Sequence, residues 1–413
     1  MTPPDAKDSV SKDRLWSRIE DLAKLGEIPG NGCCRPSLGD EDKAARDLLA
    51  QWCTESGYAV RVDQVGNQFA RRSGRDDALP PVMLGSHLDT QPTGGRFDGV
   101  AGVVAALEVL QTLDDQGTST EAPVELVNWT NEEGARFKTG LTGSSVWAGL
   151  MPLETAWNDV DPDGITLKSE LERIGYLGTE PAEAFPIKAF FELHIEQGPQ
   201  LQDADLAVAV IDKVQHMSRF DVTLRGTEAH AGTTPMSTRR DPIRALGQIL
   251  PDLYSHAEAH GPDTRLTFGS LRVLPGAVNT VPGAVHVGID LRHPDALAHA
   301  AMEDAIRETV ARRCDALAIP YELERPWGAE GIDFDAEAVA ALRRACESCD
   351  YERLDLVSGA GHDAMAVANV APAAMVFVRC LDGISHNPAE WCEPEDLTAG
   401  TNVLLHATIE AAG

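Results

Sequence analysis

The sequence predicts an α/β protein with a mostly parallel sheet and an inserted ferredoxin-like α+β domain. Short apolar runs alternate with amphipathic helical patterns in the first half of the 413-residue chain. Between residues 216 and 326 the order changes to β-α-β-β-α-β, and the helix–strand alternation then resumes. The length also exceeds that of a usual single domain.

The first part of the chain alternates strands with helices. We expect helices over 13–24, 40–56 and 98–113, and strands over 82–85, 124–129 and 190–195. A helix over 336–349, a strand over 373–378 and a closing helix over 395–411 continue the pattern. Strands separated by helices favour a parallel sheet that is covered on both faces.

The middle segment has a pattern of its own. It contains predicted strands over 219–225, 266–273, 284–291 and 320–324, with helices over 241–259 and 294–313. This split β-α-β arrangement can bury its own core. We therefore expect one discontinuous domain, 1–215 with 327–413, and an inserted domain over 216–326.

Composition excludes several classes of protein. The formal net charge is -30 and the pI is about 4.7, so the surface repels nucleic acid and anionic membranes. The longest apolar run, 100–110, contains Glu108 and is too short to span a bilayer. Residues 1–14 lack an apolar signal core, which favours a cytoplasmic location. Eight cysteines in this length do not indicate a disulfide framework.

Metal-binding residue types follow the first predicted strand. His87 and Asp89 lie on one side of an extended chain, because side chains alternate along a strand. His87 can bind a metal ion while Asp89 holds the ring from behind. Asp98 follows a glycine-rich loop at a helix start, and its two oxygens could bridge two cations. A lone His-x-Asp is more often structural, and Asp98 shifts the balance toward a metal site.

Two adjacent carboxylates follow the next strand. Glu132 and Glu133 are costly to bury unless a cation or a proton compensates their charge. Adjacent residues of an extended chain point in different directions, so one can bind metal while the other acts as a general base. A solvated acidic turn is the alternative for an isolated pair.

Two further histidines lie near strand ends. His194 ends an apolar strand, and His386 lies in a loop near the end of the chain. Each alone is equally well explained as a structural residue. An open α/β sheet places its site at the carboxyl ends of its strands, where these motifs meet. Together they suit a hydrolase in which two cations activate one water molecule.

The motifs together resemble the hydantoinase/carbamoylase family of aminoacylase-like dinuclear metallohydrolases. The matching segments lie between about residues 85 and 390: GSHLDTQPTGGRFDGVAG, NWTNEEGARF, ELHIEQGP, EAHAGTTPM, NTVPG, DLRH, SGAGHDA and DGISHNPAE. The resemblance implies hydrolysis of N-carbamoyl-L-amino acids or N-carbamoyl-β-alanine. It also implies two divalent ions per subunit, with Zn, Mn, Co or Ni as candidates.

The resemblance assigns roles to the metal-site residues. It implies that Asp98 bridges both ions, that His87 and His194 complete one site, and that Glu133 and His386 complete the other. Glu132 would then be the general base.

The resemblance also assigns substrate contacts and an assembly. It implies a homodimer in which His230 reaches the partner's metal site and stabilises the oxyanion. Arg292 and Asn279 would hold the substrate carboxylate, and Gln197 the ureido group. The glycine-rich loop with Gly361 and His362 is expected to line the substrate pocket.

Other activities remain open from the sequence. Allantoate amidohydrolase is one alternative. A dipeptidase or aminoacylase is another, but much of that wider group has an acidic residue where this chain has His194. A binding protein without catalysis would need a lost ligand or base, and all of these residues are present.

Overall fold

The computed structural model describes residues 10–413, which form two units. The first combines the chain up to Asp212 with Phe334–Gly413, and the second is Lys213–Asp333. The expected boundaries at 216 and 326 both fall inside the second unit. One reason is that its last strand continues to Ala329 and does not end at 324.

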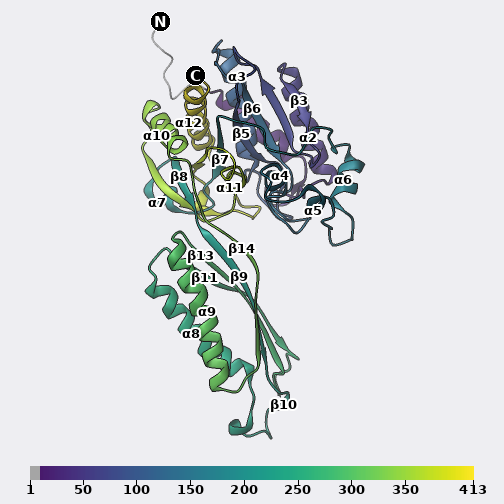
Figure 1. The fold of residues 1–413 in the computed structure, drawn as a ribbon, viewed down its shortest axis with the longest axis vertical. Helices are drawn as coiled ribbons and strands as arrows, with labels where there is room; N and C mark the ends of the chain where they lie inside the picture. Colours follow the sequence, from purple (N-terminus) through teal and green to yellow (C-terminus); the bar gives the residue numbers. More distant parts are fainter. Residues whose placement is uncertain (1–9) are drawn as a thin grey trace. The chain divides into compact units, whose positions relative to one another are not determined.

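A mixed sheet forms the centre of the first unit (Figure 1). Its strands are β3 (Ala59–Val62), β4 (Gln68–Arg72), β5 (Val82–His87), β6 (Val124–Trp129), β7 (Ala189–Ile195), β8 (Val208–Val214), β16 (Arg353–Ser358) and β17 (Ala373–Val378). They run in the order β8-β17-β7-β5-β6-β4-β3, and β16 pairs with β8. A small hairpin, β1 (Glu27–Ile28) with β2 (Gly32–Cys33), lies outside this sheet.

The prediction of a mostly parallel sheet is wrong at the edges. The pairs β17–β7, β7–β5 and β5–β6 are parallel. The pairs β8–β17, β6–β4 and β4–β3 are antiparallel. The central strands are buried along their whole length, whereas β3 and β4 carry three arginines and lack the apolar run that reveals a buried strand.

Helices surround the sheet of the first unit. They are α1 (Lys12–Ala23), α2 (Asp40–Glu55), α3 (Val100–Asp115), α4 (Thr142–Trp147), α5 (Leu153–Trp157), α6 (Leu167–Ile174), α7 (Gln200–Ala204), α10 (Ala336–Ser348), α11 (Asp363–Val367) and α12 (Pro394–Ala412). A short 3-10 turn, η3, covers Leu381–Gly383. The core lies where α3 and α12 pack against each other and on the central strands, and α3 is buried on nearly every side.

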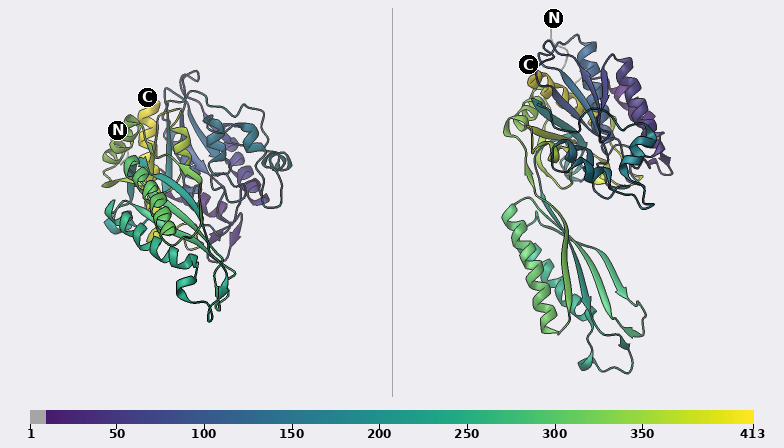
Figure 2. Two further views of the ribbon diagram at one scale, coloured as in Figure 1. Left: turned by 60° about the horizontal axis from the view of Figure 1, so that its bottom comes forward. Right: turned by 45° about the vertical axis from the view of Figure 1, so that its right-hand side comes forward.

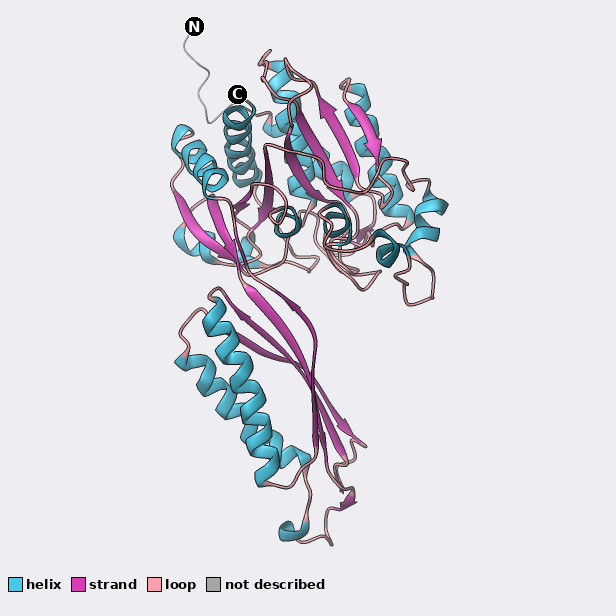
Figure 3. Cartoon of the chain, viewed as in Figure 1, coloured by secondary structure: helices cyan, strands magenta, loops and turns pink. Residues whose placement is uncertain are grey.

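The second unit is an antiparallel sheet with two helices on one face (Figures 2 and 3). Its main elements are β9 (His216–Arg225), α8 (Pro242–Ala259), β11 (Arg265–Leu274), β13 (Ala284–His293), α9 (Ala296–Ala316) and β14 (Tyr321–Ala329). Shorter pieces are β10 (Ala229–His230), η2 (Met236–Thr238), β12 (Thr280–Val281) and β15 (Ile332–Asp333). This is the β-α-β-β-α-β order that the sequence predicts.

Burial explains the layering of the second unit. Alternate residues of β13 are buried, so one face of the sheet packs on α8 and α9. Among residues 10–413, no helix has both the length and the apolar character that crossing a membrane requires.

Candidate active site

The loops after β5, β6, β7 and β17 meet at one edge of the sheet in the first unit. Parallel strands bring their carboxyl ends together there. These loops and the strand ends that precede them carry the five predicted metal ligands: His87, Asp98, Glu133, His194 and His386. The structure brings all five together, as two groups that share Asp98.

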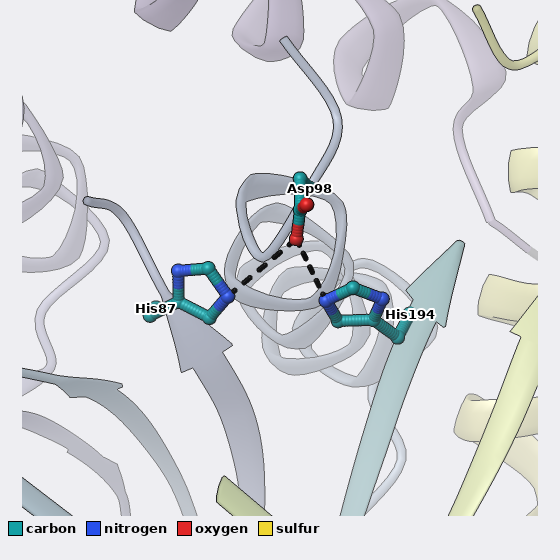
Figure 4. Close-up of side chains that lie close together, drawn as sticks. All are labelled: His87, Asp98 and His194. Carbon is teal, nitrogen blue, oxygen red and sulfur yellow. Dashed lines mark ion pairs between the residues drawn. The ribbon is translucent and has the colours of Figure 1, made fainter. Parts of the chain in front are cut away.

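The inner group consists of His87, His194 and one oxygen of Asp98 (Figure 4). Nε2 of His194 lies 3.1 Å and Nε2 of His87 lies 3.7 Å from Oδ1 of Asp98. Nδ1 of His87 lies 2.9 Å from the carbonyl of Asp89, and Nδ1 of His194 lies 3.0 Å from that of Ile195. Each ring therefore donates its Nδ1 proton to the backbone and leaves Nε2 to bind a cation.

The outer group consists of Glu133, His386 and the other oxygen of Asp98. Nε2 of His386 lies 3.2 Å from Oδ2 of Asp98 and 3.5 Å from Oε2 of Glu133. Gln91 also binds the Glu133 carboxylate, through Nε2 at 2.7 Å and its backbone N–H at 3.2 Å. The side chain of His386 is 51% exposed, whereas those of His87 and His194 are 1% exposed.

The Asp98 carboxylate governs protonation in both groups. Burial lowers the pKa of His194 but Asp98 raises it more strongly, to about 9. A hydrogen bond to Asp98 raises the pKa of His386 to about 9. Burial lowers the pKa of His87 to about 4, and burial with the charge of Asp98 raises the pKa of Glu133 to about 8. The site is thus rich in buried negative charge, which a cation would stabilise.

Glu132 lies beside the inner group. Its Oε2 is 3.5 Å from Nε2 of His87, and it is not a member of either ligand group. Burial and the neighbouring Asp363 raise the pKa of Glu132 well above its usual range. Asp363 accepts a hydrogen bond from Ser144 at 2.5 Å. A carboxylate with a raised pKa beside the reacting atoms is suited to accept a proton and return it.

The predicted bond between the Asp89 carboxylate and His87 is wrong. Its Oδ1 is 3.8 Å from Nδ1 of His87, which bonds to the Asp89 carbonyl instead. The carboxylate accepts the backbone N–H groups of Glu132 and Glu133, each at 3.2 Å. The chain turns after β5, so the carboxylate faces the neighbouring loop. Asp89 therefore positions both glutamates through their backbone.

Three polar side chains surround Asp98. Nε2 of Gln197 donates to Oδ2 of Asp98 at 2.9 Å and to Ser385 Oγ at 3.1 Å. Gln197, which the resemblance assigns to the substrate, thus also contacts a ligand. Ser385 and the buried Glu390 complete the cluster. Neither residue has a role predicted from the sequence, where their only signal is their place in the motif around His386.

His362 lies beside His194. It is buried, its ring centroid is 4.4 Å from that of His194, and its Nε2 lies 2.9 Å from Ser358 Oγ. His362 thus packs on the ring of a predicted metal ligand, and its contact with a substrate stays a prediction. Gly361, just before it, is partly exposed in the loop between β16 and α11.

The second unit holds the remaining predicted residues. The pairing of β10 with β12 sets His230 opposite Thr280, and the N–H of Ala231 donates to the Asn279 carbonyl at 3.0 Å. His230 and Asn279 are thus neighbours. Arg292 lies within β13, where its Nε and Nη2 donate to the two oxygens of Asp290 at 2.7 and 3.2 Å.

The backbone that follows His230 sets the tautomer of its imidazole ring. The N–H groups of Gly232 and Thr233 point at Nδ1 of His230, at 3.1 and 3.2 Å. Nδ1 is therefore an acceptor, and the neutral ring carries its proton on Nε2. The exposed Nε2–H is available to donate a hydrogen bond.

Unusual backbone conformations cluster around the first unit's site. Asn131, Gln197 and His386 all have positive φ, at 54°, 55° and 52°. Such angles are uncommon for these residue types and concentrate at functional sites. Gly99 also has a positive φ, and a Cβ there would lie 2.3 Å from the His87 ring. Glycine at this position lets the imidazole approach the start of α3.

These features define an α/β protein with two His–carboxylate groups at the carboxyl edge of its sheet, which are candidates for metal binding. Residues 83–410 match the model of Peptidase family M20/M25/M40, and the chain belongs to this family. Enzymes of this family are metal-dependent hydrolases.

Several known proteins and solved structures are similar to this chain over nearly its whole length. An N-carbamoyl-L-amino-acid amidohydrolase of Rhizobium meliloti is 40% identical over 412 residues, which cover 100% of this chain and 99% of the relative. An allantoate amidohydrolase of Escherichia coli (strain K12) is 34% identical over 385 residues, covering 93% and 94%. A solved amidase of the hydantoinase/carbamoylase family from Burkholderia multivorans has a TM-score of 0.94 at 45% identity and 98% coverage of each chain. The resemblance to this family is confirmed.

Proposed function

We propose that the protein hydrolyses the carbamoyl group of N-carbamoyl-L-amino acids, or of N-carbamoyl-β-alanine, to the amino acid, CO2 and ammonia. The observation that carries the proposal is Asp98, which directs one oxygen to each of two His–carboxylate groups. Glu132 lies beside them. The substrate class comes from the names of the relatives.

The residues fit a pair of divalent ions, for which Zn, Mn, Co and Ni are candidates. His87 and His194 would hold one ion, Glu133 and His386 the other, and Asp98 would bridge them. The ions would polarise the carbamoyl carbonyl and acidify a water molecule.

Glu132 performs the proton transfers in this proposal. It accepts a proton from the attacking water as the new C–O bond forms at the carbamoyl carbon. It returns that proton to the leaving nitrogen as the C–N bond breaks. Asp89 fixes where Glu132 lies, because it binds the backbone N–H of that residue.

The remaining contacts follow the resemblance. Asn279 and Arg292 would bind the substrate carboxylate, the latter beside its partner Asp290. Gln197 and Gly361 would line the ureido end. In a homodimer, His230 of one subunit would donate its Nε2 proton to the developing oxyanion in the other, which agrees with its tautomer.

Allantoate hydrolysis is the second candidate, favoured by the Escherichia coli relative. An α- and a β-amino acid differ by one methylene, which changes discrimination by only about 1–3 kcal/mol. Substrate choice is therefore a question for measurement.

The test is a substrate panel. Metal-stripped protein is reloaded with Mn, Co, Ni or Zn and given an N-carbamoyl-L-α-amino acid, N-carbamoyl-β-alanine, allantoate and an N-acetyl amino acid. We expect metal-dependent ammonia release from a carbamoyl substrate. If only allantoate or the acetyl compound is hydrolysed, the result would support the proposed metal site and exclude the proposed reaction.

A further inference from the structure

Glu390 is a buried carboxylate that accepts hydrogen bonds both from the loop of His386 and from the backbone at Asp98. Its Oε1 accepts the backbone N–H groups of Phe97 and Asp98 at 2.9 and 3.1 Å, and its Oε2 accepts Ser385 Oγ at 2.8 Å. It lies 1% exposed in the loop that carries His386. Glu390 therefore joins this loop to the backbone of the shared ligand.

The chain makes space for this carboxylate at Gly95. A Cβ at Gly95 would lie 2.2 Å from Cδ of Glu390, so the Glu390 side chain would have to move. Glycine at position 95 therefore leaves room for the Glu390 carboxylate beside the amides of Phe97 and Asp98.

Ser385 is placed between two acceptors that compete for its single proton. Its Oγ is 2.8 Å from Oε2 of Glu390 and 3.1 Å from Oδ2 of Asp98. Gln197 donates to Ser385 Oγ, so that oxygen is already an acceptor. A hydroxyl donates one hydrogen bond, and the shorter distance assigns the proton to Glu390.

We propose that Glu390 is a positioning residue which draws the Ser385 proton away from Asp98 and so keeps Oδ2 of Asp98 open to a cation in the outer group. This inference rests on the proposed metal-dependent function. Without the Glu390 acceptor, the Ser385 hydroxyl turns to Oδ2 of Asp98. There it occupies a lone pair that the outer ion would use, while Oδ1 and the inner group stay unchanged.

The variant Glu390→Gln isolates this effect. The amide oxygen can keep both backbone bonds, while the amide nitrogen becomes a donor to Ser385 Oγ. The Ser385 proton is then directed to Asp98. Hydrogen bonds to charged groups are strong enough that we expect the outer ion to bind about tenfold or more weakly. The inner ion should bind as in the wild type.

The experiment is a titration of metal-free protein with Co²⁺ alone, followed by visible absorption and by metal content. A double-mutant cycle separates the proton effect from loss of charge or of structure. In a Ser385→Ala background, where no hydroxyl can turn, Glu390→Gln should change the outer Kd by no more than about threefold. Glu393→Gln is the matched control, because it removes an exposed charge from the same segment, and should change neither Kd.

Equal weakening by Glu390→Gln in both backgrounds, or no weakening in either, would overturn the inference. If Glu390→Gln does not fold, Gly95→Ala provides the second test, since its methyl displaces the Glu390 carboxyl. That variant must lose outer affinity selectively, and equal loss at both sites would count against the inference. Wild-type protein that binds two Co²⁺ ions but hydrolyses no carbamoyl substrate would reject the proposed function and leave this inference standing.

Discussion

Stripping of the bound ions by a chelator is expected to occur in two steps, because the two groups differ in the donors that engage their ligand atoms. In the outer group, Gln91 donates twice to Glu133, and Gln197 donates to Oδ2 of Asp98. In the inner group one backbone amide, that of Gly99, points at Nε2 of His194. An outer ion must therefore compete with more donors.

The expected ratio between the Kd values of the two ions follows from the energies of these hydrogen bonds. A hydrogen bond to a charged group contributes about 1.5–3 kcal/mol, and about 1.4 kcal/mol corresponds to a factor of ten in Kd. Weakening one such bond when the outer ion binds makes its Kd about 10- to 100-fold higher than that of the inner ion. The half-exposed His386 ring also weakens binding of the outer ion, because water can replace this ring as a ligand.

The assay is competition with a graded series of chelators, with metal content measured after each step. We expect one ion to be removed by a chelator whose affinity for the metal is about 10- to 100-fold lower than that of the chelator that removes the other ion. The variant His386→Ala should lack the weak step and keep the tight ion. Simultaneous loss of both ions from the wild type, or loss of both from His386→Ala, would contradict a difference in affinity between the two groups.

Three further outcomes are expected. Asp89→Asn keeps one acceptor oxygen, so the backbone N–H of Glu132 or of Glu133 loses its partner, and kcat should fall about tenfold to a hundredfold in a steady-state assay. His386, whose pKa is raised to about 9 beside Asp98, is protonated at pH 7, and a cation must displace this proton. Titration calorimetry at pH 6.5, 7.5 and 8.5 should therefore show affinity rising with pH, by about tenfold per unit for each proton released. His230→Ala should lower kcat by about 10²- to 10³-fold with both ions retained, and full turnover in this variant would exclude its role.

The central strands and their loops could be predicted because burial leaves a signal in the sequence. The segment 373–378 is an uninterrupted apolar run, and 124–129 is apolar except at Glu125 and Asn128. The structure has strands with those bounds. The edge strand β3 and its neighbour β4 carry arginines and show no such signal. The mixed character of the sheet therefore appeared only in the structure.

The ligand set could be predicted from motifs, but the hydrogen-bond partners could not. Motif spacing places Asp89 two residues after His87, yet the turn after β5 directs its carboxylate to the next loop. Glu390 reaches the Asp98 amide across 292 positions of sequence. Contacts of this kind depend on loop conformation, which short-range patterns do not encode.

The most direct test of the proposed function compares wild type with Glu132→Gln, both loaded to the same metal content, in ammonia release from an N-carbamoyl-L-amino acid. We expect metal-dependent turnover in the wild type and loss of nearly all turnover in Glu132→Gln, with both ions still bound. Turnover in Glu132→Gln close to that of the wild type, at equal metal content, would contradict the proposal.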